Sequence, residues 1–257
     1  FWLDEKAESY YFVGKDNVPF HAIIWPAMLL AYGDLNLPTN VPANQYILIK
    51  GEKASASRGV GKTLNDYLEE WNPDSLRYSL ASILPEQNDS EISEDEMIRR
   101  NNEELVAAWG NLVQRVFSQY INNFDILDFE FELEEVDKKL IEEAEVCFNN
   151  TGSLIEKVEL KASLQSIMAY VNKINAYLNQ TEPWKVIKED KKRATAILYS
   201  AITCIDASAT MFTPFMPTSS EKVLQAIQKE TDNNWSLNKI KKGAQIENIG
   251  HLFKKID

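Results

Sequence analysis

A polar loop of small residues carries the first pattern in this chain that is typical of chemistry. Gly61-Lys62-Thr63 follows a predicted strand and opens a predicted helix. In a phosphate-binding P-loop, G-x-x-x-x-G-K-[ST], backbone N–H groups cradle a phosphate and the lysine adds charge at a helix start. The first glycine of that motif falls at Ala56, however, and no second acidic strand for Mg²⁺ is evident. A P-loop NTPase is therefore one alternative, and a serine-rich surface loop is another.

A second set of residues is suited to holding nucleic-acid bases. Asn111 and Arg115 are four residues apart on a predicted helix, so an amide and a guanidinium share a face and can bond to base edges. Trp184 follows Pro183 near a predicted helix junction, where an exposed indole can stack on an unstacked base. Simpler roles remain open: a surface charge for Arg115, a polar helix face for Asn111 and core packing for Trp184. The cations that could contact phosphate follow closely, at Lys185, Lys188, Lys191, Lys192 and Arg193.

The charge balance changes sign along the chain. The 257 residues include 27 Lys and Arg against 39 Asp and Glu, a net charge of −12. Residues 151–257 hold 15 basic and 11 acidic residues, or +4, which leaves 12 and 28, or −16, for residues 1–150. An acidic protein is a poor partner for phosphate. The acidic charge therefore argues against nucleic-acid binding by the first part of this chain only.

Composition excludes several classes of protein. The 44% hydrophobic share is enough to build a core, so the chain is not a disordered tail. No uninterrupted apolar run approaches the roughly 18–20 residues of a membrane span, so we expect no integral membrane protein. Cys147 and Cys204 lie far apart without C-x-x-C spacing, which argues against a disulfide scaffold or zinc knuckle and fits a reducing cytoplasm.

The elements that must position these residues are mixed α/β at first. Strands are predicted at 10–13 and 46–49, and an apolar segment at 18–32 predicts a buried helix with a break at Pro26. Short helices follow Thr63 and Pro73. Residues 85–95 read as a linker or a helix start.

The rest of the chain is helical by its periodicity. Apolar residues recur at helical spacing over 109–121, 160–178 and 194–212, and the short polar breaks between them predict an antiparallel bundle. The acidic stretch 125–145 holds ten carboxylates, which we expect to form a solvated loop and helix face without chemistry.

Longer motifs resemble those of methionyl-tRNA synthetases, a family of class I aminoacyl-tRNA synthetases. Residues 14–29, GKDNVPFHAIIWPAML, are similar to a family signature, and residues 53–59, KASASRG, resemble its flexible lysine loop, K-M-S-K-S followed by Arg-Gly. Other motifs match in the same order, namely DSLRY at 74–78, EPW at 182–184, PFMP at 214–217 and LFKKI at 252–256. The similarity covers essentially all 257 residues.

The resemblance implies a mainly α fold with an α/β N-terminal part. It places the second half of a Rossmann-type catalytic domain at 1–44, a stem-contact region with the lysine loop at 45–100, and an α-helical anticodon-binding bundle at 101–257. The family's H-I-G-H motif, first half-fold and zinc-bearing insertion would precede residue 1. We therefore expect the C-terminal portion of a ligase that is inactive by itself, since half a site cannot position ATP.

The resemblance also implies partners and residues. The intact cytoplasmic ligase would use ATP with Mg²⁺ to activate methionine and charge tRNA(Met), with no membrane involved. By resemblance, the ATP site holds Gly14, Asp16, Ile47 and Lys53, and the catalytic loop holds Lys53, Ser55 and Ser57. The methionine pocket holds Phe20, His21 and Trp25, for which core packing is the alternative. The anticodon readers are Asn111, Arg115 and Trp184.

The lysine loop departs from the family pattern at two positions. Ala56 stands where the family has a second lysine, and Ala54 stands where it has methionine. One phosphate-facing cation and one apolar anchor are thereby missing, so we expect attenuated adenylate formation. A helical tRNA-binding module without catalysis is the remaining alternative.

Overall fold

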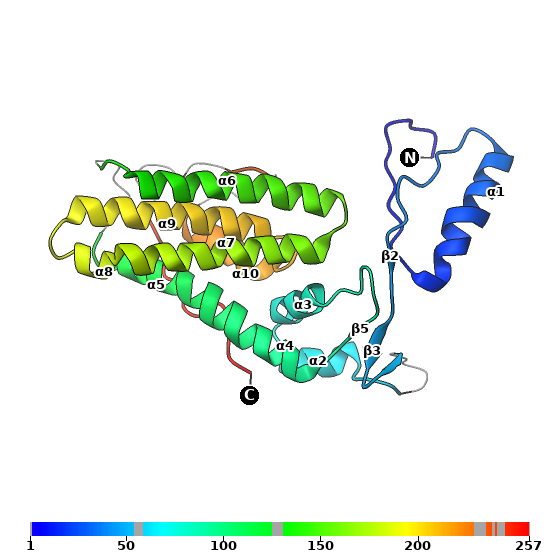
Figure 1. The fold of residues 1–257 in the computed structure, drawn as a ribbon, viewed down its shortest axis with the longest axis horizontal. Helices are drawn as coiled ribbons and strands as arrows, with labels where there is room; N and C mark the ends of the chain where they lie inside the picture. Colours follow the sequence, from blue (N-terminus) through cyan, green and yellow to red (C-terminus); the bar gives the residue numbers. More distant parts are fainter. Residues whose placement is uncertain are drawn as a thin grey trace. The chain divides into compact units, whose positions relative to one another are not determined.

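The computed structural model describes residues 2–53, 59–124, 131–228, 235–237, 240 and 245–256. Contacts within the chain divide it into two compact units, which we describe separately. The first unit comprises Phe1–Thr63 with Ile83–Ser93, and the second comprises Leu64–Ser82 with Glu94–Asp257. Figure 1 shows the strands in the first unit and most of the helices in the second.

The first unit begins with a β–α–β arrangement. β1 (Val13–Gly14) pairs in parallel with β2 (Ala43–Asn44), with Val13 opposite Ala43. Between them lie η1 (Lys15–Asn17), the π-helical η2 (Phe20–Ile24) and α1 (Trp25–Tyr32). A parallel pair needs such a crossover. This confirms the α/β character expected of the N-terminal part.

A three-stranded sheet follows in the same unit. β3 (Ile47–Ile49) lies between β4 (Glu52–Lys53), antiparallel to it, and β5 (Ser90–Glu91), parallel to it. Lys50 and Gly51 both have positive φ, at 53° and 78°, as a tight type I′ hairpin turn requires. The strand expected at 46–49 is confirmed. β5 lies within the segment 85–95, which was predicted to be a linker or a helix start. The strand was not predicted because two residues are too few to produce a strand pattern in the sequence.

Two predictions for the first unit are wrong. The segment 18–32 is helical and changes from π to α at Trp25, next to Pro26, as the predicted break required. It is not buried, since only Leu29 among its residues is, at 7% exposure. The strand expected at 10–13 is limited to Val13 and a single bridge from Tyr10 to Asn40. The apolar residues of 18–32 need a covering surface that the described part of this unit does not provide. Those left exposed include Phe20, Ile23, Ile24, Met28, Leu30 and Tyr32.

The second unit contains the expected helical bundle. In Figure 1, α6, α7 and α9 lie alongside one another, and their short connections make consecutive helices antiparallel. Its elements are α2 (Leu64–Glu70), α3 (Pro73–Ser82), α4 (Glu94–Arg100), the π-helical η4 (Asn101–Gly110), α5 (Asn111–Ile121), α6 (Glu135–Glu156), α7 (Leu160–Thr181), α8 (Pro183–Val186), α9 (Lys191–Phe212) and α10 (Pro217–Ala226).

The core of this unit follows the predicted apolar stripes. The residues of the 109–121 stripe are buried, apart from the partly buried Ile121. α9 is the one described helix that is long and apolar enough to cross a membrane, but 89% of its most apolar window is buried inside the protein. It is therefore the central helix of the bundle core.

The motif at 74–78 joins α3 to the end of the bundle. The Asp74 carboxylate is buried and accepts the backbone N–H of Ser219 at 2.6 Å, in the first turn of α10. The Arg77 guanidinium donates to the backbone carbonyls of Phe215, at 2.9 Å, and Pro214, at 2.8 Å. Two of the motifs that carry the resemblance, at 74–78 and 214–217, thus contact each other.

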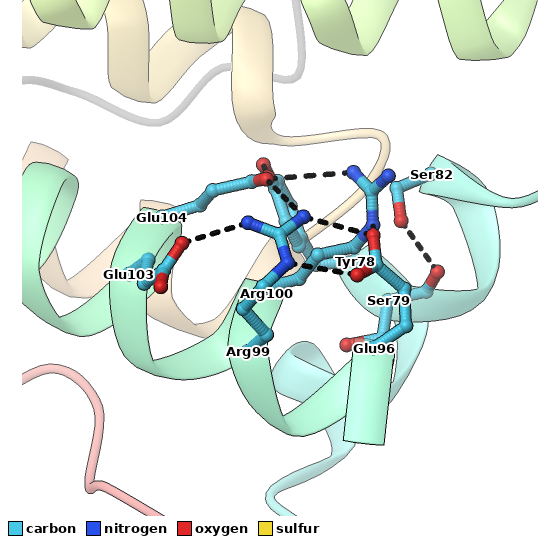
Figure 2. A network of polar contacts seen from close by, with 8 residues as sticks. All are labelled: Tyr78, Ser79, Ser82, Glu96, Arg99, Arg100, Glu103 and Glu104. Carbon is cyan, nitrogen blue, oxygen red and sulfur yellow. Dashed lines mark hydrogen bonds and ion pairs between the residues drawn. The ribbon is translucent and has the colours of Figure 1, made fainter. Parts of the chain in front are cut away.

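Tyr78 joins α3 to the helix that leads into the bundle. Its hydroxyl donates to the Glu104 carboxylate at 2.5 Å, and burial, followed by the charge of Glu104, raises the pKa of Tyr78. Figure 2 shows the two arginines beside it: Arg100 pairs with Glu96 at 2.8 Å, and Arg99 pairs with Glu96 and with Glu103 at 2.7 Å each. This network connects α3, α4 and η4.

Candidate functional site

A charged cluster in the first unit brings together two residues expected at an ATP site. The Lys53 ammonium at the end of β4 pairs with the Asp16 carboxylate in η1 at 3.0 Å. Tyr46 joins both, because its hydroxyl donates to Asp16 and its ring centroid lies 3.7 Å from the Lys53 nitrogen. Folding therefore unites groups that are 37 residues apart in the sequence.

Two further residues complete the cluster. Lys15 pairs with the Asp89 carboxylate at 2.7 Å, and its nitrogen lies 3.9 Å from the Tyr46 ring centroid. Asp89 also accepts the backbone N–H of Tyr46 at 2.8 Å. Sequence reasoning missed Tyr46 and Asp89. Tyr46 stands at the head of the predicted strand and was assigned no role, whereas Asp89 lies in the polar segment 85–95 without any distinguishing signal.

Hydrogen bonds within the cluster favour the charged forms of Asp16, Lys53 and Asp89. Hydrogen bonds from Tyr46 and then Lys53 hold the pKa of Asp16 below its ordinary value, and the bond to Asp16 raises the pKa of Lys53. The bond from Lys15 likewise lowers the pKa of Asp89. Two cations and two carboxylates therefore balance in the free protein, at a solvent-exposed position.

The other residues expected at the ATP site are placed only in part. Gly14 is exposed at the end of β1, with open space where a side chain would stand, and Ile47 is half-buried in β3. Ser55 and Ser57, with Ala54 and Ala56, lie outside the described residues. Gly61-Lys62-Thr63 of the P-loop alternative lies between the β3–β4 hairpin and α2, and Ala56, where its first glycine would stand, is outside the described residues.

The residues expected at a methionine pocket are brought together in part. Trp25 makes edge contacts with Tyr11, at 4.6 Å between ring centroids, and with His21, at 6.1 Å. The His21 Nδ1 atom lies 3.1 Å from the carbonyl oxygen of Asn17. Phe20 is 56% exposed and takes part in none of these contacts. His21 and Trp25 thus share an aromatic cluster, and Phe20 lies outside it.

The second unit brings together two of the three expected anticodon readers. The Arg115 guanidinium carbon lies 5.8 Å from the centroid of the Trp184 ring, which is 36% exposed. Trp184 is therefore not a core residue. Asn111 begins α5, one turn before Arg115, and both residues are exposed.

Backbone chemistry explains the position of Trp184. A residue before proline avoids the helical region, and Glu182 instead adopts left-handed angles at φ 41°, which ends α7. Pro183 then opens α8, where its missing N–H costs nothing. Trp184 follows directly, at the helix junction expected from the sequence.

The basic residues after Trp184 fall into two groups. Lys185 pairs with Glu182 at 2.7 Å, and Arg193 pairs with the Asp137 carboxylate, so these two are engaged within the bundle. Lys188, Lys191 and Lys192 are exposed and form no ion pair within the described ranges.

Asp137 corrects the expectation for the acidic stretch 125–145. It is fully buried and accepts hydrogen bonds from Arg193, from the Tyr177 hydroxyl at 2.6 Å and from the Glu134 backbone at 2.9 Å. Burial alone would raise the pKa of Asp137, but these donors outweigh it and hold the pKa below its ordinary value. It is a structural carboxylate that charge counting cannot separate from its solvated neighbours.

A cleft in the second unit contains none of the predicted site residues. It measures about 380 Å³ and lies between α3, the α4–η4 helix and α7, beside Tyr78, Arg100 and Glu104. Those groups bond to one another, so we assign no ligand to the cleft. No group of three His, Cys, Asp or Glu side chains among the described residues could hold a metal ion. Cys147 and Cys204 are buried and unbridged.

Comparisons with known proteins match two successive parts of the chain. A family model for tRNA synthetases class I (M) matches residues 1–117, and a model for the anticodon binding domain of methionyl tRNA ligase matches residues 130–257. The chain is 40% identical over 238 residues to methionine--tRNA ligase from Chloroflexus aurantiacus, covering 86% of this chain and 40% of that protein. The same enzyme from Roseiflexus sp. (strain RS-1) is 43% identical over 217 residues, covering 84% and 37%.

Solved structures show the same fold. Mycobacterium tuberculosis methionyl-tRNA synthetase in complex with methionyl-adenylate has a TM-score of 0.87 and 25% identity, over 95% of this chain and 50% of that one. The chain thus spans about two fifths of the length of the relatives named above and half that of the solved structure. Successive family models, close relatives and a shared fold together show that the chain belongs to the methionyl-tRNA synthetase family.

Proposed function

We propose that this chain forms the anticodon-reading part, and one wall of the nucleotide site, of a methionine--tRNA ligase. Such an enzyme uses ATP to activate methionine and transfers it to tRNA(Met). The observation that carries the proposal is the Arg115 guanidinium facing the half-exposed Trp184 indole at the edge of a helical bundle. A flat ring beside a planar cation suits a splayed, unstacked base.

The three readers would divide the recognition of a CAU anticodon. Trp184 would stack on one base, which is typically worth about 1–3 kcal/mol. Arg115 and Asn111, on one face of α5, would bond to the edges of the bases. Lys188, Lys191 and Lys192 would contact backbone phosphates, which makes binding salt-dependent but carries no sequence information.

The charged cluster of the first unit would hold ATP. The Asp16 carboxylate would accept ribose hydroxyls, with Gly14 and Ile47 beside the nucleotide, and Lys53 would face the phosphates. Because Asp16 and Lys53 pair with each other here, each must exchange its partner for the nucleotide. The methionine carboxylate would attack the α-phosphorus, and the bond to the β-phosphate would break to release pyrophosphate. Lys53, together with Ser55 and Ser57 of its loop, would stabilise the charge that develops in this step.

The methionine side chain would lie beside the aromatic cluster. His21 and Trp25, which contact each other there, would line or support the pocket, with Phe20 as a further contact. The Mg²⁺ that accompanies ATP is assigned no protein ligand. Because the chain spans about two fifths of its relatives, we expect adenylate formation only in the intact ligase.

Binding of the chain to tRNA tests the anticodon assignment. We expect tighter binding of a CAU transcript than of a permuted anticodon, and Trp184→Ala should weaken CAU binding by about 5- to 150-fold. Trp235→Ala is a matched control, since that indole is 40% exposed but stacks on Phe148 instead. Equal affinity for both transcripts, or equal effects of the two substitutions, would contradict the proposal.

Methionine-dependent exchange of pyrophosphate into ATP tests the catalytic assignment. In the intact ligase, Lys53→Ala should lower the exchange rate by about 10²–10³-fold, and Ala56→Lys should raise it. An unchanged rate in Lys53→Ala would contradict the role of Lys53, and an intact protein without exchange activity would favour the alternative, a tRNA-binding module without catalysis.

A further inference from the structure

Arg115 is held by a neutral partner. Its Nη2 atom donates to the side-chain oxygen of Asn175, on α7, at 3.1 Å. Within the described residues it pairs with no carboxylate. The bond uses one of the five N–H donors of the guanidinium and leaves its charge uncompensated. Arg115 thus keeps both charge and donors for a ligand.

Asn175 is itself fixed by the backbone around it. Its side-chain nitrogen donates to the carbonyl oxygens of Ala108, at 3.0 Å, and of Val171, at 3.2 Å. Together with the bond from Arg115, both ends of the partly buried amide are therefore occupied, and its orientation is set. The oxygen must face Arg115, because the nitrogen is committed to the two carbonyls.

The Ala108 carbonyl lies at a change of helix type. The N–H of Asn111 bonds to the carbonyl of Val106, five residues back, and η4 gives way to α5 at that point. An amide from α7 supplies a donor to this last turn, so Asn175 contacts both the junction and the arginine one turn beyond it.

We infer that Asn175 is a positioning residue for anticodon reading, an inference that rests on the function proposed above. It holds the Arg115 guanidinium beside the Trp184 ring before tRNA arrives. An arginine side chain has many rotamers, and a side chain that is ordered in advance loses less conformational entropy on binding. A fixed guanidinium meets one base edge, whereas a free one reaches any nearby phosphate. Asn175 therefore contributes more to discrimination between anticodons than to affinity.

A double-mutant cycle on the whole chain tests the inference. The readout is the ratio of affinities for CAU and permuted transcripts, measured by filter binding, with folding checked by circular dichroism. Asn175→Ala should lower this ratio by about 2- to 10-fold and change affinity for the permuted transcript little. In an Arg115→Ala background the same substitution should leave the ratio unchanged, because Asn175 acts through Arg115.

Two further variants separate positioning from a structural role. Asn175→Asp keeps an acceptor beside Arg115, but its charge compensates the guanidinium and it loses the donors to Ala108 and Val171. It should therefore weaken binding of both transcripts more than Asn175→Ala does, whereas a purely structural role predicts similar binding by the two variants. Asn172→Ala removes an exposed amide one turn earlier on α7 and should change the binding of neither transcript.

Each outcome has one meaning. If Arg115→Ala and Trp184→Ala leave discrimination intact, the proposed function fails. If they reduce it while Asn175→Ala does not, or if Asn175→Ala reduces it equally without Arg115, the inference about Asn175 is overturned.

Discussion

The buried carboxylate of Asp137 should be one of the strongest polar contributors to the stability of the second unit. It accepts four hydrogen bonds, two from Arg193 and one each from Tyr177 and the Glu134 backbone, and so joins α6, α7 and α9. Removing one member of a buried ion pair typically costs about 3–5 kcal/mol. In Asp137→Asn one oxygen remains as an acceptor, and Glu134 still pairs with Arg193 at 3.0 Å. We therefore expect the lower end of the range, about 3 kcal/mol.

Urea unfolding followed by circular dichroism measures this loss. The urea concentration at the unfolding midpoint should fall, while the dependence of the unfolding free energy on urea should stay unchanged. The substitution removes an interaction of the folded state and does not change how much surface unfolding exposes. Glu135→Gln is the matched control, because Glu135 is the next acid on α6 and pairs with Lys138 at the surface, where such pairs contribute about 0–1 kcal/mol. A loss below about 1 kcal/mol in Asp137→Asn would refute the assignment of a structural role.

The same carboxylate predicts how stability depends on pH. Its pKa is lower in the folded protein than the ordinary value of about 4, so the folded state favours the charged form. Its contribution is complete above that ordinary value and is lost as pH falls through it toward the lower folded pKa. Unfolding midpoints of the wild-type protein and Asp137→Asn should therefore converge below about pH 4. A gap that stays constant down to pH 2.5 would contradict this reasoning.

Two further predictions concern buried groups of the second unit. Tyr78→Phe removes a hydrogen bond to the Glu104 carboxylate and should lower the unfolding free energy by about 1.5–3 kcal/mol, measured in urea; an unchanged midpoint would contradict this. Burial raises the pKa of the Cys204 thiol to about 12 and that of Cys147 above its ordinary value. Neither thiol should react with a disulfide reagent such as DTNB at pH 8 in the native protein, and both should react in urea; rapid native labelling would show that the thiols are accessible.

The helical bundle could be predicted from the sequence because its pattern is local. Each long helix carries its own apolar stripe at a period of 3.6 residues, and Trp109, Leu112 and Val116 are buried as that period requires. The junction at Trp184 was likewise predictable, since Pro183 ends one helix and begins the next by its own chemistry. Local stereochemistry decides both features.

The features that the sequence did not reveal depend on contacts between distant segments. β5 is two residues long, and Asp89 beside it gains its importance only through Lys15 and Tyr46, which lie far from it in the chain. Asp137 is one of ten acids in its segment, and among those that the structure describes it is the only buried one. The apolar segment 18–32 led to a wrong prediction of burial, because an apolar surface does not specify what covers it.

The residues around the proposed anticodon site depend on α7 more than on any other helix. Asn175 and Tyr177 are two positions apart on α7, which places them roughly 200° apart around the helix axis. Asn175 bonds to η4 and α5, while Tyr177 bonds to Asp137 on α6, which is paired with Arg193 on α9. α7 therefore fixes the helix that carries Arg115 from one side. On its opposite side α7 holds the start of α9 through Tyr177, Asp137 and Arg193, and its own end leads into residues 182–190. Both ends of the connection that carries Trp184 are therefore fixed. Arg115 and Trp184 lie on different elements, but polar bonds tie both elements to α7. Hydrogen bonds are directional and so permit less sliding than apolar contacts do, which keeps the separation of the two readers constant.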